Sequence, residues 1–280
     1  MRLAPEYRID AASIRITPPP AWVAEGFLTD ALLRAGLVAP NGVGQLSILD
    51  AAGVVEQNLA QATSASPYVR SVTAVSREAP RGANVEVEYR TPAALAITSL
   101  GAEPLDAEGV RLPRGRLTTA DLASLPRFRL QRLEGAGLPA PPLVGAAWND
   151  PRVRGGCALL ARLAPYWKAM RLEDLTTDRA PEQRGGLAYP TFTLRTIGDT
   201  AVVWGAAEGF GPPNEPSFAE KLSRFRQFVA ATGPLDSLDG TPRRVHVRYQ
   251  LRVEARVAKL ESTEDADEPI KQAASPSDVR

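Results

Sequence analysis

Two runs of alternating apolar residues, joined by a short turn, constrain the fold of this chain more than any other feature. The apolar residues of the two runs are Val69, Val72, Val75, Val85, Val87 and Tyr89. Between the runs, Pro80 to Gly82 supplies residue types that are common in tight turns. Successive side chains of a β-strand point to opposite faces, so the pattern predicts a β-hairpin over residues 69 to 98 with one buried face.

One strand and two helices are predicted before the hairpin. Residues 14 to 16 alternate in a short strand, which the three prolines at 18 to 20 bring to an end. From Trp22 to Leu37, apolar residues recur every three or four positions, which is typical of an amphipathic helix. A second helix follows, with Asp50 as its expected N-cap. The order strand, helix, helix, strand, strand therefore predicts a first domain of residues 1 to 98.

The residues after 98 predict a larger sheet domain with flanking helices. Its expected elements are a strand and turn at Leu105 to Pro113, a helix from Val153 to Met170 interrupted at Pro165, a hairpin of Phe192 to Thr196 and Ala201 to Trp204, a helix from Ser217 to Ala231, and a last strand or pair of strands from Arg243 to Val257. We therefore expect an α+β protein whose second domain, 99 to 258, holds a mostly antiparallel sheet. Residues 259 to 280 are acidic and poor in apolar residues, so we expect them to be disordered.

Composition excludes several classes of functional site. Cys157 is the only cysteine and His246 the only histidine, which excludes an intrachain disulfide and any Cys-cluster or His-rich metal site. No metal and no cofactor is predicted. Lysine and arginine number 33 against 32 aspartate and glutamate residues, so the net charge gives no attraction to nucleic acid or an anionic membrane. The sequence also contains neither the ~20-residue apolar stretch of a transmembrane helix nor a basic-then-apolar signal peptide.

Four features of the sequence have both a functional and a simpler structural interpretation. Asp106 to Gly109 could ligate a cation, but a β-turn is favoured because no further ligands follow at the spacing of a calcium loop. Gly155-Gly156 and Gly185-Gly186 lack the flanking residues of phosphate-binding loops. An arginine cluster could bind nucleic acid, although a solvated face is favoured because aromatic residues are scarce near it. The cluster consists of Arg114, Arg116, Arg127, Arg129 and Arg132.

Five short motifs occur in a defined order along the chain. They are Pro67-x-Val69 with Val72 and Val75, Arg90-x-Pro92-Ala93, the turn from Leu105 through Asp106 and Gly109 to Leu112, Glu220-Lys221-Leu222, and Val245-His-Val-Arg-Tyr249. In this order they resemble the FtsQ/DivIB cell-division family from Ile14 to Val257. That family consists of a POTRA domain followed by a C-terminal β domain, so the resemblance implies these two domains for this chain.

Two features depart from the family pattern. The family has a transmembrane helix directly before its POTRA domain, and this chain contains none before Ile14. Membrane association is therefore expected only if an anchor precedes the sequence. In addition, His246 replaces the aspartate that is usual in the final strand, and three prolines follow the first strand.

The resemblance implies a non-catalytic scaffold of the division machinery on the periplasmic face of the inner membrane. In the family, partner division proteins of the FtsB/FtsL type bind at the C-terminal edge of the second sheet. The resemblance carries this role to Tyr249, Leu251, Val253 and Ala255. Backbone hydrogen bonding at a sheet edge supports the same role. A terminal strand leaves one row of N–H and C=O groups free to pair with an added strand.

Two other functions remain open. The chain could be a POTRA-type binding module of another envelope assembly or secretion system. It could also be a hydrolase built on His246, the one candidate imidazole base. We favour a polar position on the outer face of a sheet for His246, because no serine or cysteine lies in the sequence context of a nucleophile elbow.

Overall fold

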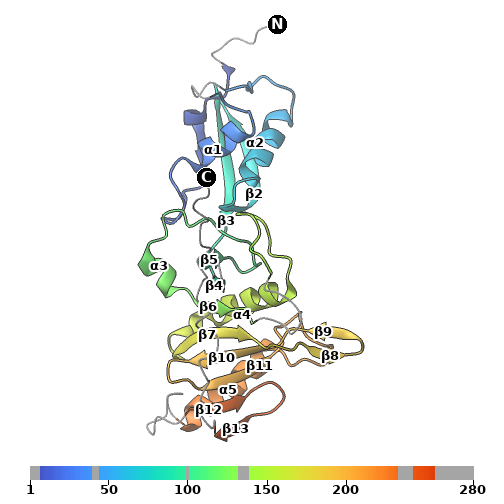
Figure 1. Cartoon of the computed structure of the whole chain (residues 1–280). Helices are drawn as coiled ribbons and strands as arrows, with labels where there is room; N and C mark the ends of the chain where they lie inside the picture. The colour runs from blue at the N-terminus through green and yellow to red at the C-terminus, as the bar shows by residue number, and fades with distance from the viewer. Residues whose placement is uncertain (1–6, 40–43, 99–100, 132–138, 233–241, 256–280) are drawn as a thin grey trace, which may run out of the picture.

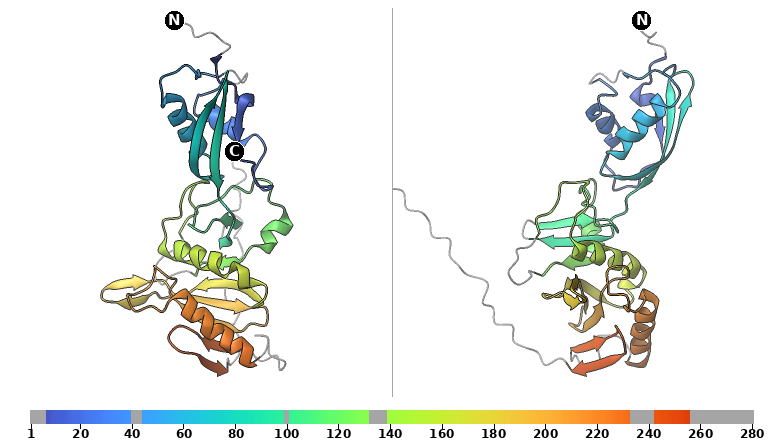
Figure 2. Two further views of the ribbon diagram at one scale, coloured as in Figure 1. Left: turned by 180° about the vertical axis from the view of Figure 1, so that it is seen from behind. Right: turned by 90° about the vertical axis from the view of Figure 1, so that its right-hand side faces the viewer.

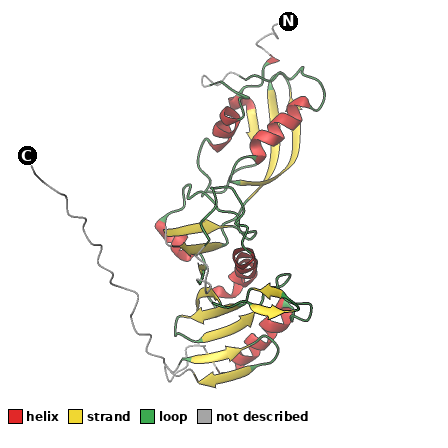
Figure 3. Cartoon of the chain, turned by 45° about the vertical axis from the view of Figure 1, so that its right-hand side comes forward, coloured by secondary structure: helices red, strands yellow, loops and turns green. Residues whose placement is uncertain are grey.

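The chain folds around two separate hydrophobic cores. Each core belongs to its own sheet, and the two sheets lie apart in Figures 1 and 3. The computed structural model describes residues 7–39, 44–98, 101–131, 139–232 and 242–255. Residues up to Tyr89 pack on the smaller core, and the larger core begins at Ala94. The protein is α+β, as expected from the sequence.

A three-stranded sheet with two helices on one face forms the N-terminal part (Figure 2). Its elements are β1 (Ile14–Ile16), α1 (Phe27–Arg34), α2 (Val54–Ser64), β2 (Val69–Glu78) and β3 (Gly82–Tyr89). The strand order is β1-β3-β2, with β1 parallel and β2 antiparallel to β3. These elements follow one another in the order that the sequence predicts.

The predicted hairpin is formed by β2 and β3, and its apolar side chains pack against the two helices. Buried side chains of this core include Leu32, Leu59, Val69, Val85 and Val87. Burial of a side chain of this size contributes about 1.5 to 3 kcal/mol. Val72 and Val75 are only partly buried, and the pairing of β2 with β3 shifts register on either side of Val72. The hairpin is therefore confirmed, with β2 less regular than strict alternation suggests.

Both N-terminal helices begin later than the sequence suggests. α1 begins at Phe27, because Gly26 before it has a φ of +75° that a helix cannot accommodate. α2 begins after Gly53, whose N–H donates to the Glu56 carboxylate at 3.1 Å. The prediction of Asp50 as the N-cap was wrong. Its carboxylate instead accepts a hydrogen bond from the N–H of Ser47 at 2.7 Å and so stabilises the turn before the helix.

The larger part contains an eight-stranded sheet and a separate two-stranded hairpin. Its elements are β4 (Ala94–Thr98), β5 (Gly101–Leu105), α3 (Thr119–Ser124), β6 (Arg127–Arg129), α4 (Pro151–Trp167), β7 (Leu172–Thr177), β8 (Glu182–Arg184), β9 (Leu187–Tyr189), β10 (Phe192–Thr196), β11 (Ala201–Gly205), α5 (Phe218–Thr232), β12 (Arg243–His246) and β13 (Arg252–Ala255). The order in the large sheet is β13-β12-β11-β10-β7-β6-β4-β5, and β8 pairs with β9. Antiparallel pairs outnumber parallel ones among the described strands, as expected.

Two parallel pairs of the large sheet are connected through helices. α4 joins β6 to β7, and α5 joins β11 to β12. Parallel neighbours need such a crossover, because a tight turn can only reverse the chain. Both crossovers step toward β13, and connections of the usual right-handed sense then put both helices on one face. α4 and α5 accordingly share a single core with the sheet.

The boundary between the two sheets falls earlier than residue 98. β4 pairs with β5 and β6, so residues 94 to 98 belong to the larger sheet. The apolar run of β4 fits this place, because Ala94, Leu95 and Ala96 are all buried. The sequence of a strand that is covered on both faces is a continuous run of apolar residues. Such a run does not show which sheet the strand joins.

Close packing of α4 explains its glycine pair. A Cβ added at Gly156 would lie 2.6 Å from the ring of Phe128, so the helix approaches β6 more closely than any side chain would allow. Gly155 and Gly156 are therefore packing positions inside a helix. Pro165 does not interrupt α4, which continues to Trp167.

The last alternating segment folds as a pair of strands. β12 and β13 are antiparallel and are joined by residues 247–251. The sequence left open one strand or two, and the structure shows two. The acidic residues 259 to 280 lie outside the described part of the chain.

Candidate functional site at the edge of the larger sheet

β13 occupies one end of the eight-stranded sheet, at the bottom of Figure 1. Its residues Arg252 to Ala255 pair with His246 to Arg243 of β12. Among the described strands none lies on its other side. An edge strand presents outward N–H and C=O groups that can pair with another polypeptide.

The predicted contact residues lie along this edge, although not on one strand. Tyr249 and Leu251 belong to the connection between β12 and β13, and their residues are 50% and 40% exposed. Val253 lies within β13 and is 44% exposed. Ala255 is the last residue of β13, opposite Arg243. The four residues do not lie on one continuous strand, because the chain turns back between Val247 and Leu251.

Hydrogen bonds from α5 hold the start of this connection in place. Arg224 donates from Nη1 to the carbonyl oxygens of Val247 at 3.2 Å and Arg248 at 2.6 Å. Val247 is fully buried in the larger core. The exposed residues that follow are therefore attached to a fixed backbone.

A largely buried cluster of ion pairs also holds this connection in place. The Glu215 carboxylate accepts hydrogen bonds from Arg248 Nε at 2.9 and 3.1 Å, and it also pairs with the ammonium group of Lys221. Lys221 donates in addition to the carbonyl oxygen of Ala206 at 2.7 Å. Arg248 forms a second ion pair with Glu182 of β8. The cluster thus links α5, β8 and the residue directly before Tyr249.

Burial changes the acid–base behaviour of the cluster. Lys221 is 1% exposed, and this burial lowers its pKa below the ordinary value, because the charged ammonium loses its hydration. The Glu215 carboxylate favours the charged form and opposes the shift only in part. The ion pair with Glu215 therefore stabilises the charged form of the buried Lys221 ammonium.

Two glycines make room for the cluster. A Cβ at Gly205 would lie 2.4 Å from Cδ of Arg248, and the φ of this glycine is +84°. A Cβ at Gly211 would lie 2.8 Å from Cγ of Glu215. The backbone around the cluster is therefore fitted to these two side chains.

The sequence contains one signal for this cluster, the position of Lys221. Lys221 falls three residues after Phe218 and four before Phe225, which places it on the buried face of the predicted helix. A charged residue at such a position needs a buried partner. Nothing in the sequence identifies that partner as Glu215, which lies in an irregular loop rich in glycine and proline.

His246, the candidate base of the hydrolase alternative, is the last residue of β12. Its neighbours Val245 and Val247 point into the core, so its ring lies on the opposite face of the sheet. There His246 Nε2 lies 3.6 Å from a carboxylate oxygen of Glu254. Cys157 is buried among the residues of the core, and burial raises the pKa of its thiol. The sheet therefore separates the thiol from the imidazole.

The turn at Asp106 uses its carboxylate for structure. Asp106 Oδ1 accepts hydrogen bonds from the N–H groups of Glu108 at 2.9 Å and Val110 at 2.8 Å, and Oδ2 accepts one from Arg90 at 2.5 Å. The N–H of Gly109 donates to the carbonyl oxygen of Asp106 at 3.1 Å. The β-turn interpretation is confirmed.

Several members of the arginine cluster have separate partners. Arg116 pairs with Glu25 at 2.5 Å, and Arg129 with Asp174 at 3.0 Å. Arg114 donates to the carbonyl oxygen of Ala102 at 3.0 Å. Arg127 is exposed on β6. Arg132 lies outside the described residues.

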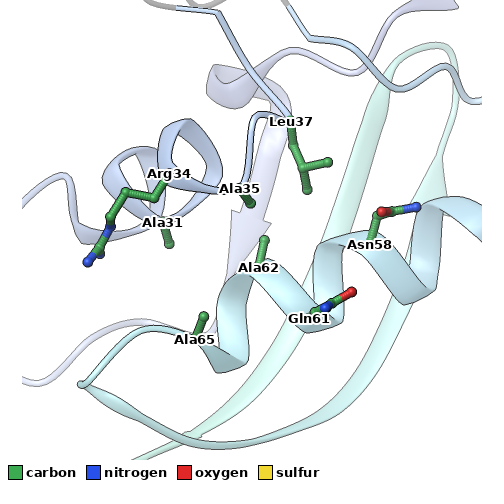
Figure 4. Close-up of a pocket in the computed structure, with 8 residues that line it drawn as sticks. All are labelled: Ala31, Arg34, Ala35, Leu37, Asn58, Gln61, Ala62 and Ala65. Atoms are coloured by element: carbon green, nitrogen blue, oxygen red, sulfur yellow. The ribbon is translucent and has the colours of Figure 1, made fainter.

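A hollow lies between α1 and α2 of the smaller part (Figure 4). Its lining is Ala31, Arg34, Ala35, Leu37, Asn58, Gln61, Ala62 and Ala65. The guanidinium of Arg34 bends back to its own helix, where Nε donates to the carbonyl oxygen of Asp30 at 3.1 Å. The hollow is formed largely by small alanine side chains, and we favour the β13 edge as the functional site.

Comparisons with known proteins leave the family of this chain open. No protein-family model and no curated protein matches it. Within the described residues, no helix is both long enough and apolar enough to span a lipid bilayer. The assignment of a function therefore depends on the geometry described above.

Proposed function

We propose that this protein is a non-catalytic scaffold of the bacterial cell-division machinery, which binds partner proteins by strand addition. The partners would be division proteins of the FtsB/FtsL type on the periplasmic face of the inner membrane. Each partner would add an extended segment to β13 and continue the eight-stranded sheet.

The arrangement of elements supports this proposal. A unit of strand, two helices and two strands precedes a mixed sheet with two helices on one face, which is the order that the resemblance to FtsQ/DivIB implies. The motifs behind that resemblance fall at structural junctions. Asp106 forms the turn next to the smaller sheet, Lys221 anchors α5, and Tyr249 follows β12.

The single observation that carries the proposal is the row of exposed apolar side chains at an edge with which no described strand pairs. Proteins usually protect an edge strand with charges, short length or a covering segment. β13 is short and carries charges, but Tyr249, Leu251 and Val253 expose apolar surface next to it. Apolar surface beside a free sheet edge is what a partner strand would bury.

Replacement of this apolar surface tests the proposal. Leu251→Ser combined with Val253→Ser should leave the fold intact, because surface substitutions usually change stability by less than about 0.5 kcal/mol each. We expect cells depleted of the wild-type protein to remain undivided filaments when they express this double variant. The measurement is cell length, with thermal unfolding of the purified variant as the check on folding.

Leu187→Ser provides a matched control, because Leu187 is 60% exposed on β9 and does not belong to the β13 edge. Cells that express this control should divide normally. Normal division with the double variant at β13 would contradict the proposal.

The second candidate function is a binding module of another envelope system. The position of β2 at the end of the smaller sheet favours it. β2 is a ten-residue strand at the end of the smaller sheet and could also receive a strand. This function predicts that depletion disturbs envelope assembly while cells still divide. The same depletion experiment therefore separates the two functions.

A further inference from the structure

We propose that the β13 edge selects a partner strand that carries one acidic and one basic side chain on one face, with an apolar side chain between them on the other. The inference depends on the strand addition proposed above and names the chemistry of the partner. The side chains that would contact this pattern belong to three consecutive residues of β13, Arg252, Val253 and Glu254.

The register of β12 and β13 assigns each of these side chains to a face. Val253 lies opposite Val245, which is fully buried in the core beneath α5. Val253 therefore points to the helix-covered face. Arg252 and Glu254 flank it and point to the other face, because successive residues of a strand alternate.

The two charged side chains are accessible and of opposite sign. The side chain of Arg252 is 65% exposed and that of Glu254 is 37% exposed. They form an ion pair with each other at 2.9 Å. On β12, the same face presents His246, 3.6 Å from Glu254, and the exposed Arg244. The edge thus offers a positive and a negative group two residues apart.

An added strand would lie about 4.8 Å from β13, with its side chains directly opposite those of the edge. The residue opposite Arg252 would be acidic, the residue opposite Val253 apolar, and the residue opposite Glu254 basic. This pattern holds for both strand directions, because reversal of the strand only exchanges the order of acid and base. Like charges directly opposite one another on neighbouring strands are destabilising.

Synthetic strand peptides test the inference without knowledge of the natural partner. Three peptides of equal length would differ only in a central triplet, Glu-Val-Lys, Glu-Val-Glu or Lys-Val-Lys. The wild-type chain should bind the mixed peptide about 3- to 10-fold more tightly than either of the others, a range that corresponds to cross-strand charge pairs. The preference should weaken as salt is added, because the charges are exposed.

Charge substitutions on the protein should change the preference in a defined way. Glu254→Arg makes both edge charges positive and should favour the peptide with two glutamates. Arg252→Glu makes both negative and should favour the peptide with two lysines. Arg184→Glu changes an exposed arginine on β8 and should leave the order of the three affinities unchanged.

The outcomes separate this inference from the function it depends on. Equal binding of all three peptides to the wild-type chain and both edge variants would overturn the charge rule and leave strand addition intact. If the wild-type chain binds none of the peptides, strand addition at β13 is itself contradicted, and the charge rule is overturned with it. Circular dichroism of each variant checks that the fold is unchanged.

Discussion

Lys221 helps to hold the exposed segment around Tyr249 in place, although it is linked to that segment only through Glu215 and Arg248. Its ammonium is buried and bonded to Glu215 and to the carbonyl oxygen of Ala206. Glu215 in turn holds Arg248, the residue directly before the exposed Tyr249. A buried charge is stable only with its partners in place, so the cluster tolerates few alternative positions of this segment.

Removal of the Lys221 charge should therefore destabilise the chain. In Lys221→Met the side chain keeps its length, but Glu215 loses one of its two cationic partners. We expect the free energy of unfolding to fall by about 2 to 4 kcal/mol, near the range for a broken buried ion pair. Urea denaturation measures it. Gln227→Met on the exposed side of α5 is the control and should change stability by less than about 0.5 kcal/mol. A Lys221→Met chain as stable as the control would contradict this role.

At the scale of elements, one ion pair joins α2 to β2. Arg77 donates from Nε and Nη2 to the Glu56 carboxylate at 2.8 and 3.0 Å, and from Nη1 to the carbonyl oxygens of Ile48 and Asp50 at 2.7 Å each. Glu56 also accepts from the N–H of Gly53 at the start of the helix. The hydrogen bond from Arg77 is the main reason that the pKa of Glu56 falls from its ordinary value of 4.5 to about 2.

The shift predicts a pH dependence of stability. Because the folded pKa of Glu56 is lower than the unfolded one, its contribution is complete above about pH 4.5 and is lost as the pH falls toward 2. The contribution is small, because the pair is partly exposed. Glu56→Gln should be less stable than the wild type at pH 7, with the difference vanishing near pH 2. Urea denaturation at several pH values measures this, and a difference that does not depend on pH would contradict it.

Periodic segments were predictable from the sequence, because their side chains alone determine which face is buried. The hairpin of β10 and β11 and the helix α5 lie within a residue or two of their expected limits. Positions that depend on distant contacts were not predictable. β4 joins the larger sheet through its pairing with β6, and α1 starts late because of the backbone at Gly26.

The candidate edge could be predicted only in part. Exposed positions at Tyr249, Leu251 and Val253 follow from an alternating segment near the end of a sheet. The turn after Val247 could not be predicted from the sequence. The alternation of apolar and polar residues continues through it, and no glycine or proline marks the reversal of the chain. Its cause lies elsewhere in the chain, in the hydrogen bonds from Arg224.

For the whole molecule, a group of ion pairs links the part of the chain around the smaller core to the part around the larger one. Arg90 pairs with Asp106 at 2.5 Å and with Glu108 at 3.2 Å, and Arg70 pairs with Glu108 at 2.7 Å. The hydrogen bond from Arg70 is the main cause of the lowered pKa of Glu108. The smaller sheet and the β13 edge lie at opposite ends of the molecule in Figure 1. Partners at one end therefore need not compete with partners at the other.

Site-specific photo-crosslinking in dividing cells tests strand addition at β13 most directly. A photoreactive residue at Val253 would probe the edge, and the same residue at Gln61 would probe the hollow between α1 and α2. Our account predicts that Val253 crosslinks to a membrane-anchored division protein and that Gln61 does not. Crosslinks to that protein from Gln61 and none from Val253 would contradict it.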